Sequence, residues 1–195
     1  MGMKSMDVRM VLGRNYVEGN YASENSLEVA EHFRIIAEVN EELFKHIPFE
    51  VVFTDDDCYA SAKEMRERVI KEGVIYIYKG GSDHPFLTPE QNVIGRAVHD
   101  VYAHMVCGCP FNFQGELNAY YEQRKHYPET VWATLFAEIP MQTAAYYYTG
   151  GFNHPQRAIK ATEQDMQLVE HMKKDYSANS VLGIDYFDKK ILVKG

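Results

Sequence analysis

The 195-residue chain has little of what marks secreted, membrane-spanning or nucleic-acid-binding proteins. It holds three cysteines, at Cys58, Cys107 and Cys109, which is too few for a disulfide framework, so we expect a reducing cytoplasm. No apolar run approaches the roughly 18–20 residues of a membrane helix, and the first residues lack the apolar stretch of a secretory signal. We therefore expect a cytoplasmic protein without a membrane partner.

Basic residues are outnumbered by acidic ones. The chain has 20 Lys and Arg against 28 Asp and Glu, a formal net charge of −8, and no basic block. This balance argues against a nucleic-acid partner, because backbone binding needs clustered positive charge. A small-molecule substrate remains compatible with it, and the oligomeric state is left open. The 14 Tyr and 10 Phe indicate a well-filled core or an aromatic-lined pocket.

Hydrophobic spacing predicts a mostly helical α+β domain with a small early β-sheet. At this length we expect residues 1–195 to form a single domain. Pro140 predicts a kink or break in a helix over 128–151. The spacing predicts helices at 26–47, 60–73, 89–108, 114–127, 128–151 and 162–177, and strands at 49–53, 74–78 and 181–187.

The helix predicted over 89–108 carries unexpected polar residues. It begins with a capping signal in which Thr88 is the N-cap and Gln91 closes a capping box. Further along, "AVHDVYAHMV" places His99, Asp100 and His104 among valines and alanines. Two imidazoles and a carboxylate on an apolar helix are either hydrogen-bonded core residues or the beginning of a metal site.

A catalytic metal site needs about three protein ligands and an open position. Two carboxylates interrupt apolar surroundings and are candidates for the third ligand: Glu138 in "LFAEIPM" and Glu116 in "FQGELNAY". Burying a carboxylate is costly unless it is paired or bound to a metal. Gln142 lies four residues after Glu138 and could support it. The alternatives are that Glu138 pairs with a buried Arg or Lys and that Glu116 favours a helix start.

The spacing of the two histidines sets a geometric requirement. His99 and His104 are five residues apart, which places them about 140° apart on a regular helix. Converging on one ion would need a local π-type widening, a feature that often occurs at functional sites. The spacing also differs from the H-E-x-x-H of zinc peptidases. Cys107 and Cys109 could instead join His104 in a structural zinc site.

The pattern His-acid-x-x-x-His, from His99 to His104, resembles the iron-binding segment of aromatic amino acid hydroxylases. "SDHPFLTPEQ" is similar to the loop before that segment, "ATLFAEIPM" to the later helix with the ligand Glu, and "YYYTGGF" to the stretch after it. The likeness covers the expected metal-site core, about residues 49–152, with Ala103 where the family has Gly. It implies Fe(II) held by His99, His104 and Glu138. The pattern is also similar to phage-encoded proteins of unassigned function.

These observations favour a metal-dependent enzyme, foremost a non-haem iron oxygenase or hydroxylase acting on an apolar or planar small molecule. In it Asp100 orients a ligand or handles a proton, while Glu116 and Gln142 support the ligands. One alternative is a minimal zinc hydrolase, with Asp100 as general base and Glu116 as third ligand. Another is a non-enzymatic assembly or interaction protein with a structural polar core. Proximity of Glu116, rather than Glu138, to the histidines would favour the hydrolase.

Overall fold

A computed structural model describes residues 7–172 of the chain apart from Ser82 and Asn153. The described part is mostly helical with a small two-stranded parallel sheet early in the chain, which confirms the predicted fold class. The strand predicted over 181–187 and the end of the helix predicted over 162–177 lie outside the described residues. No helix in the described ranges is both long and apolar enough to cross a membrane.

The regular elements follow the predicted order, with one addition at the start. Two π-helical segments, Asp100–Met105 and Ala137–Met141, continue α4 and α6 respectively. Short 3-10 turns cover Arg124–His126, Glu129–Val131 and Glu170–Met172. The α-helices and strands are α1 Val8–Glu18, α2 Leu27–Lys45, β1 Glu50–Thr54, α3 Ala62–Glu72, β2 Val74–Tyr78, α4 Pro89–His99, α5 Phe113–Gln123, α6 Trp132–Phe136, α7 Gln142–Thr149 and α8 Glu163–Gln167.

The sheet is a single β–α–β unit. Strand β1 pairs in parallel with β2 from Glu50↔Val74 to Thr54↔Tyr78, and α3 makes the crossover between them. Along β2 the side chains alternate, so that Ile75 is buried and Tyr78 is exposed at the strand end. The sheet therefore offers one apolar face, which packs against α3 and α4.

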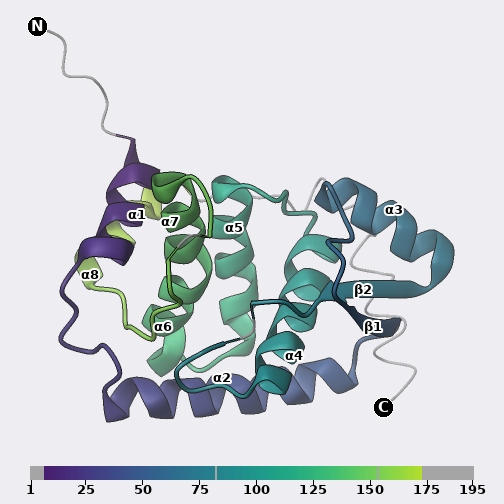
Figure 1. Cartoon of the computed structure of the whole chain (residues 1–195), viewed down its shortest axis with the longest axis horizontal. Coiled ribbons are helices and arrows are strands. Elements are labelled where there is room, and N and C mark those ends of the chain that lie inside the picture. The colour runs from purple at the N-terminus through teal and green to yellow at the C-terminus, as the bar shows by residue number, and fades with distance from the viewer. Residues whose placement is uncertain (1–6, 82, 153, 173–195) are drawn as a thin grey trace, which may run out of the picture.

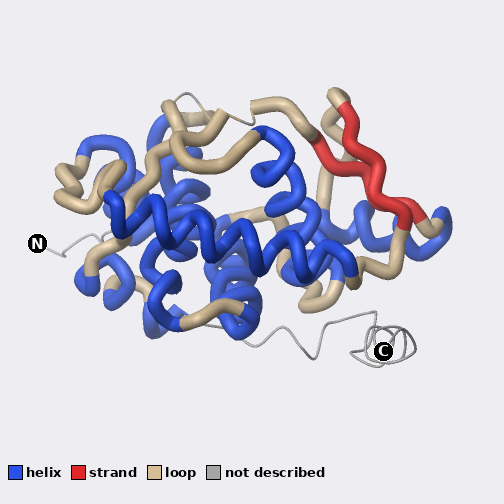
Figure 2. Tube along the Cα trace, turned by 90° about the horizontal axis from the view of Figure 1, so that it is seen from below, coloured by secondary structure: helices blue, strands red, loops and turns tan. Residues whose placement is uncertain are grey.

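Helix α2 lies across two hydrophobic cores. One core is formed with α1, α5, α6 and α7, and the other with the sheet, α3 and α4. Figure 1 shows α2 running beneath both groups, and Figure 2 shows the same helix from below, with the strands near one of its ends. Helix α5 stands between α4 and α7 (Figure 1). The side chains of α4 and α5 that face each other build the candidate site.

Helix α1 is the element that the hydrophobic pattern does not predict. It is short, and among its side chains Leu12 and Tyr16 carry the apolar burial. Its backbone lies very close to α7 at Gly13. A Cβ at this position would be only 2.4 Å from the carbonyl oxygen of Ala144, so only glycine allows the two helices to approach this closely. Such a close backbone approach depends on glycine, which a periodicity of large apolar residues cannot reveal.

The predicted break at Pro140 is accommodated within a π segment. Pro140 lies inside Ala137–Met141, and the chain continues into α7 without leaving the helical conformation. Because proline has no N–H to donate, the helical ladder changes its spacing there. The helix predicted over 128–151 is thus divided into shorter pieces on one continuous path.

A buried histidine joins α2 to α6. The Nδ1 atom of His32 lies 2.8 Å from the hydroxyl of Thr134, and both residues are buried. Desolvation lowers the pKa of His32 from its ordinary value, outweighing the nearby carboxylates of Glu28 and Glu31; Lys160 acts in the same direction as desolvation. The folded protein therefore favours the neutral imidazole.

We expect this histidine to make the protein less stable in mild acid. Below the ordinary pKa near 6.5, the unfolded chain takes up a proton that folded His32 resists. The free energy of unfolding should fall between about pH 7 and about pH 5.5, by at most about 1.4 kcal/mol per pH unit for one proton. Urea denaturation of the wild type and His32→Asn measures this. Equal pH dependence in both proteins would contradict the prediction.

Candidate metal centre

The site begins where α4 changes its pitch. The helix starts with the predicted capping box of Thr88 and Gln91 and keeps α-helical spacing to His99. Asp100–Met105 then forms a π-helix, in which the N–H of Val106 bonds to the carbonyl of Val101, 2.9 Å away. This hydrogen bond joins residues five positions apart, which widens the helical turn and brings the side chains of His99 and His104 to one side of the helix. The widening that the sequence analysis requires is therefore present.

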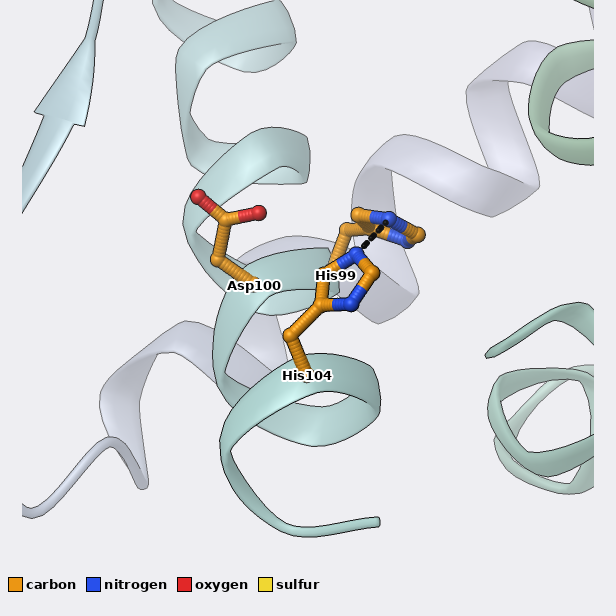
Figure 3. Close-up of side chains that lie close together, drawn as sticks. All are labelled: His99, Asp100 and His104. Atoms are coloured by element: carbon orange, nitrogen blue, oxygen red, sulfur yellow. Dashed lines mark hydrogen bonds between the residues drawn. The ribbon is translucent and has the colours of Figure 1, made fainter. Parts of the chain in front are cut away.

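The two imidazoles converge on each other (Figure 3). The Nε2 atoms of His99 and His104 lie 3.0 Å apart, and the rings meet edge to face at 4.7 Å between centroids. The other nitrogens point at oxygens: His99 Nδ1 lies 2.9 Å from Oε1 of Gln123, and His104 Nδ1 lies 2.8 Å from the carbonyl of Cys109. Both Nδ1 atoms therefore donate hydrogen, and both Nε2 atoms face the space between the rings.

A carboxylate from α5 completes the group. Glu116 Oε2 lies 3.1 Å from Nε2 of His99, and its Oε1 lies 3.3 Å from Nε2 of His104. Glu116 and Gln123 are seven residues apart on α5, which puts them two turns apart on one face. One helix therefore supplies both the carboxylate and the oxygen that orients His99.

The loop between the π segment and α5 is held in place by backbone packing. Asn112 is the N-cap of α5, and its side chain accepts a hydrogen bond from the N–H of Gly115 at 2.9 Å. A Cβ at Gly115 would lie 1.8 Å from the carbonyl oxygen of Pro110, so a larger residue does not fit. This glycine lets Glu116, the next residue, enter the first turn of α5 beside the histidines.

The charges in the group are strongly coupled. Burial alone would lower the pKa of His99, but the carboxylate of Glu116 raises it to about 9. Burial likewise opposes ionisation of Glu116, yet the two imidazoles hold the pKa of that carboxyl well below its usual range. The arrangement therefore favours an ionised carboxylate facing a positive charge, whether that charge is a proton on an imidazole or a cation in its place.

Asp100 lies beside the histidine pair without joining its hydrogen bonds. One of its oxygens and the histidine nitrogens all lie within 4.8 Å of one another. Desolvation raises the pKa of Asp100, against the effect of both histidines. The neighbouring guanidinium of Arg96 is directed to the carbonyl oxygens of Tyr78 and Gly80. Among the described residues no hydrogen bond or ion pair engages the Asp100 carboxylate, and it is one of the three possible metal donors.

His99, Asp100 and His104 form a possible metal-binding group, because one donor atom of each lies within 4.8 Å of the others. The Nε2 atoms of His99 and His104 lie 3.0 Å apart, and each faces a different oxygen of Glu116, Oε2 at 3.1 Å from His99 and Oε1 at 3.3 Å from His104. Ligands bonded at about 2.0–2.1 Å are about 3.3 Å apart around a tetrahedral ion and about 2.9 Å apart around an octahedral one. The His104 side chain is 1% exposed, whereas those of Glu116 and His99 are 14% and 21% exposed. The group is thus reachable from the side of His99 and Glu116.

Glu138, the expected third ligand, has its described contacts elsewhere. Its Oε2 accepts a hydrogen bond from Gln156 Nε2 at 2.8 Å, and its Oε1 lies 3.8 Å from Nε2 of His84. Nδ1 of His84 accepts from the backbone N–H groups of Phe86 and Leu87, so its Nε2 carries hydrogen. His84 Nε2 therefore faces Glu138 without reaching hydrogen-bond distance, and because it carries hydrogen it is not a ready metal ligand.

Gln142, expected to support the ligands, also has another described partner. Burial and, to a lesser degree, Glu138 raise the pKa of the Tyr16 hydroxyl, and the side chain of Gln142 acts on that hydroxyl to lower it. Glu138, Gln142 and Tyr16 thus form a polar group of α1, the second π segment and α7. The buried Oε1 of Glu138 and Nε2 of His84 have no hydrogen-bond partner among the described residues.

The thiols of the neighbouring Cys107 and Cys109 are in surroundings that favour their protonated form. Cys109 contributes its backbone carbonyl to His104, and the thiol of Cys107 donates to the carbonyl of Tyr102 at 3.3 Å. Burial raises the pKa of Cys107 to about 11 and that of Cys109 to about 12. Among the described residues, the donor atoms that form a possible metal-binding group come from His99, Asp100 and His104, and neither cysteine is among them.

Gln123 is the residue of this site that the sequence analysis misses. Its position seven residues after Glu116 places both side chains on one face of the helix predicted over 114–127, and this spacing could have identified it. Its side chain also continues the hydrogen bonding: Gln123 Nε2 donates to the hydroxyl of Tyr127 at 3.2 Å, and that hydroxyl donates to Oδ1 of Asn40 at 2.5 Å. His99 is thereby linked to α2.

Comparison with known protein families, curated proteins and solved structures finds no match to this chain.

Replacing Gln123 should weaken metal binding without removing a ligand. Gln123→Met keeps the bulk but removes the oxygen that fixes the ring of His99, and losses of this kind reduce metal affinity about 10–100-fold. Competition with a fluorescent zinc chelator measures the affinity. Gln114→Met is the matched control, because Gln114 lies on the same helix but bonds to the carbonyl of Met172. Equal zinc affinity in all three proteins would refute the role of Gln123.

Proposed function

We propose that this protein is a metal-dependent hydrolase in which His99, His104 and Glu116 bind one divalent ion. The observation that carries the proposal is the position of Glu116, whose two oxygens lie 3.1 and 3.3 Å from the facing Nε2 atoms. Two imidazoles and a carboxylate form a ligand set used by catalytic zinc sites, which keep a further position open. The partial exposure of His99 and Glu116 provides the access that such a position needs.

The hydrolase is favoured over the oxygenase because of the third carboxylate and the neighbouring base. Glu116, not Glu138, has described contacts with the histidine pair. Asp100 follows His99 directly, as the base follows the first histidine in H-E-x-x-H. Its carboxylate lies within 4.8 Å of both histidine donors and has no competing partner among the described residues.

Each residue then has a distinct part. A bound divalent ion would supply a Lewis acid that polarises a carbonyl and activates water. Asp100 accepts a proton from the attacking water and returns it to the leaving group. The Nδ1 atoms of His99 and His104 point at fixed oxygens, so their Nε2 atoms are the positions that would bind the ion. Glu116 balances the charge.

An iron oxygenase is the second candidate. The His99–His104 and His99–Glu116 separations of 3.0 and 3.1 Å are close to those on one face of an octahedral ion. Two histidines and one carboxylate on such a face are the ligand set of non-haem Fe(II) oxygenases. The resemblance to aromatic amino acid hydroxylases supports this candidate, with Glu116 rather than Glu138 as the carboxylate ligand.

The bound metal should distinguish these candidates. We expect nearly one zinc per chain after purification without a His tag or chelator under anaerobic conditions, and loss of that zinc in His99→Ala and Glu116→Gln. Glu138→Gln is the control and should keep it, because its described contacts are with His84 and Gln156. Elemental analysis measures the stoichiometry. Iron instead of zinc would favour the oxygenase, and no metal after reconstitution would leave a structural polar core.

Asp100→Asn should separate metal binding from hydrolysis. The amide cannot accept the proton, so we expect the zinc content to persist while hydrolysis of p-nitrophenyl acetate falls by about 10²–10⁴-fold, the usual contribution of a positioned base. Glu50→Gln, at an exposed position on β1, is the control for an added amide. Full esterase activity in Asp100→Asn would rule out the assigned base.

A further inference from the structure

An aromatic side chain stands against the histidine that is most deeply buried. The ring of Phe111 meets the ring of His104 edge to face, with centroids 4.6 Å apart and an interplanar angle of 82°. His104 is 1% exposed, whereas Phe111 is 40% exposed. One part of the Phe111 ring therefore packs on a donor of the metal centre while another part faces the surroundings.

The backbone holds this ring in a fixed position. The N–H of Asn112 bonds to the carbonyl of Pro110 at 2.9 Å, which makes Phe111 the central residue of a γ-turn. The same carbonyl is packed against Gly115, and Asn112 caps α5. The turn is held at both ends, so little conformational entropy of the turn is lost when a ligand contacts the exposed ring of Phe111.

Phe111 is an apolar side chain that contacts the polar donor group through His104. Glu116 and His99 are the partly exposed donors, and Asp100 is the neighbouring base. A substrate that places a polar carbonyl at these donors and an apolar group beside Phe111 matches both parts. An aromatic group gains more than an aliphatic one there, because rings attract each other edge to face or in offset stacks.

We propose that Phe111 is a specificity-determining residue that binds an aryl group attached to the reacting carbonyl, so that the substrates are aromatic acyl compounds. This inference rests on the proposed metal-dependent function and names its substrate class. A purely structural role, in which the ring shields His104 from water, makes a different prediction: it affects the affinity for the metal and leaves the choice between aryl and alkyl ligands unchanged.

The test uses Co(II) in place of zinc and two hydroxamates as probes. Both probes bind metals through the same two oxygens, but benzohydroxamate carries a phenyl ring and acetohydroxamate a methyl group. Their dissociation constants are measured from changes in the visible spectrum of the Co(II)-loaded protein. The wild type is compared with Phe111→Ala, Phe111→Leu and the control Phe152→Ala, which removes a ring that is 70% exposed and tilted at 51° against the ring of Tyr146.

We expect the preference of the wild type for benzohydroxamate to fall about three- to tenfold in Phe111→Ala and by a smaller factor in Phe111→Leu, with Co(II) affinity unchanged. Phe152→Ala should keep the full preference. An unchanged preference in Phe111→Ala, with or without weaker Co(II) binding, would overturn the proposal and leave the metal function standing. Failure of the wild type to bind Co(II) would overturn both, and it is recognised by the missing cobalt spectrum.

Discussion

The widened turn at Asp100–Met105 is the constraint on which the site depends. With α-helical spacing, histidines five residues apart would face directions about 140° apart, and Glu116 could meet only one of them. The π spacing aligns His99 and His104, and the loop back to α5 then brings Glu116 to both. A π segment gives up some regular helical bonding, so its presence at the polar cluster indicates that the surrounding packing maintains it.

The hydrogen bonding among His99, His104 and Glu116 depends on whether a proton or a cation lies between their side chains. Two Nε2 atoms 3.0 Å apart cannot both face each other as lone pairs without a proton or cation between them. A proton shared with Glu116 satisfies the group in one way, and a divalent ion satisfies all three donors together. A metal ion bound as proposed would therefore add to the stability of the folded chain by mass action, since the unfolded chain does not assemble these donors.

The sequence predicts the helices and strands well where the apolar spacing is strong. β2 occupies its predicted residues, and the need for a π turn follows from the histidine spacing alone. The choice between Glu116 and Glu138 could not be made, because it depends on which side of α5 each neighbouring helix packs. Helix α1 was missed because its contact with α7 relies on Gly13, and the roles of Gln123 and Phe111 arise only from tertiary packing.

The hydrogen bonds that run from His99 through Gln123 and Tyr127 to Asn40 have a fixed direction. His99 donates to the amide oxygen of Gln123, and the amide nitrogen donates onward to Tyr127. A carboxylate in that place could take a proton from one side and release it to the other, but an amide does not do so at neutral pH. Gln123 therefore insulates the centre on its inner side. If the proposed function holds, the partly exposed side of His99 and Glu116 is where protons and substrate would reach the centre.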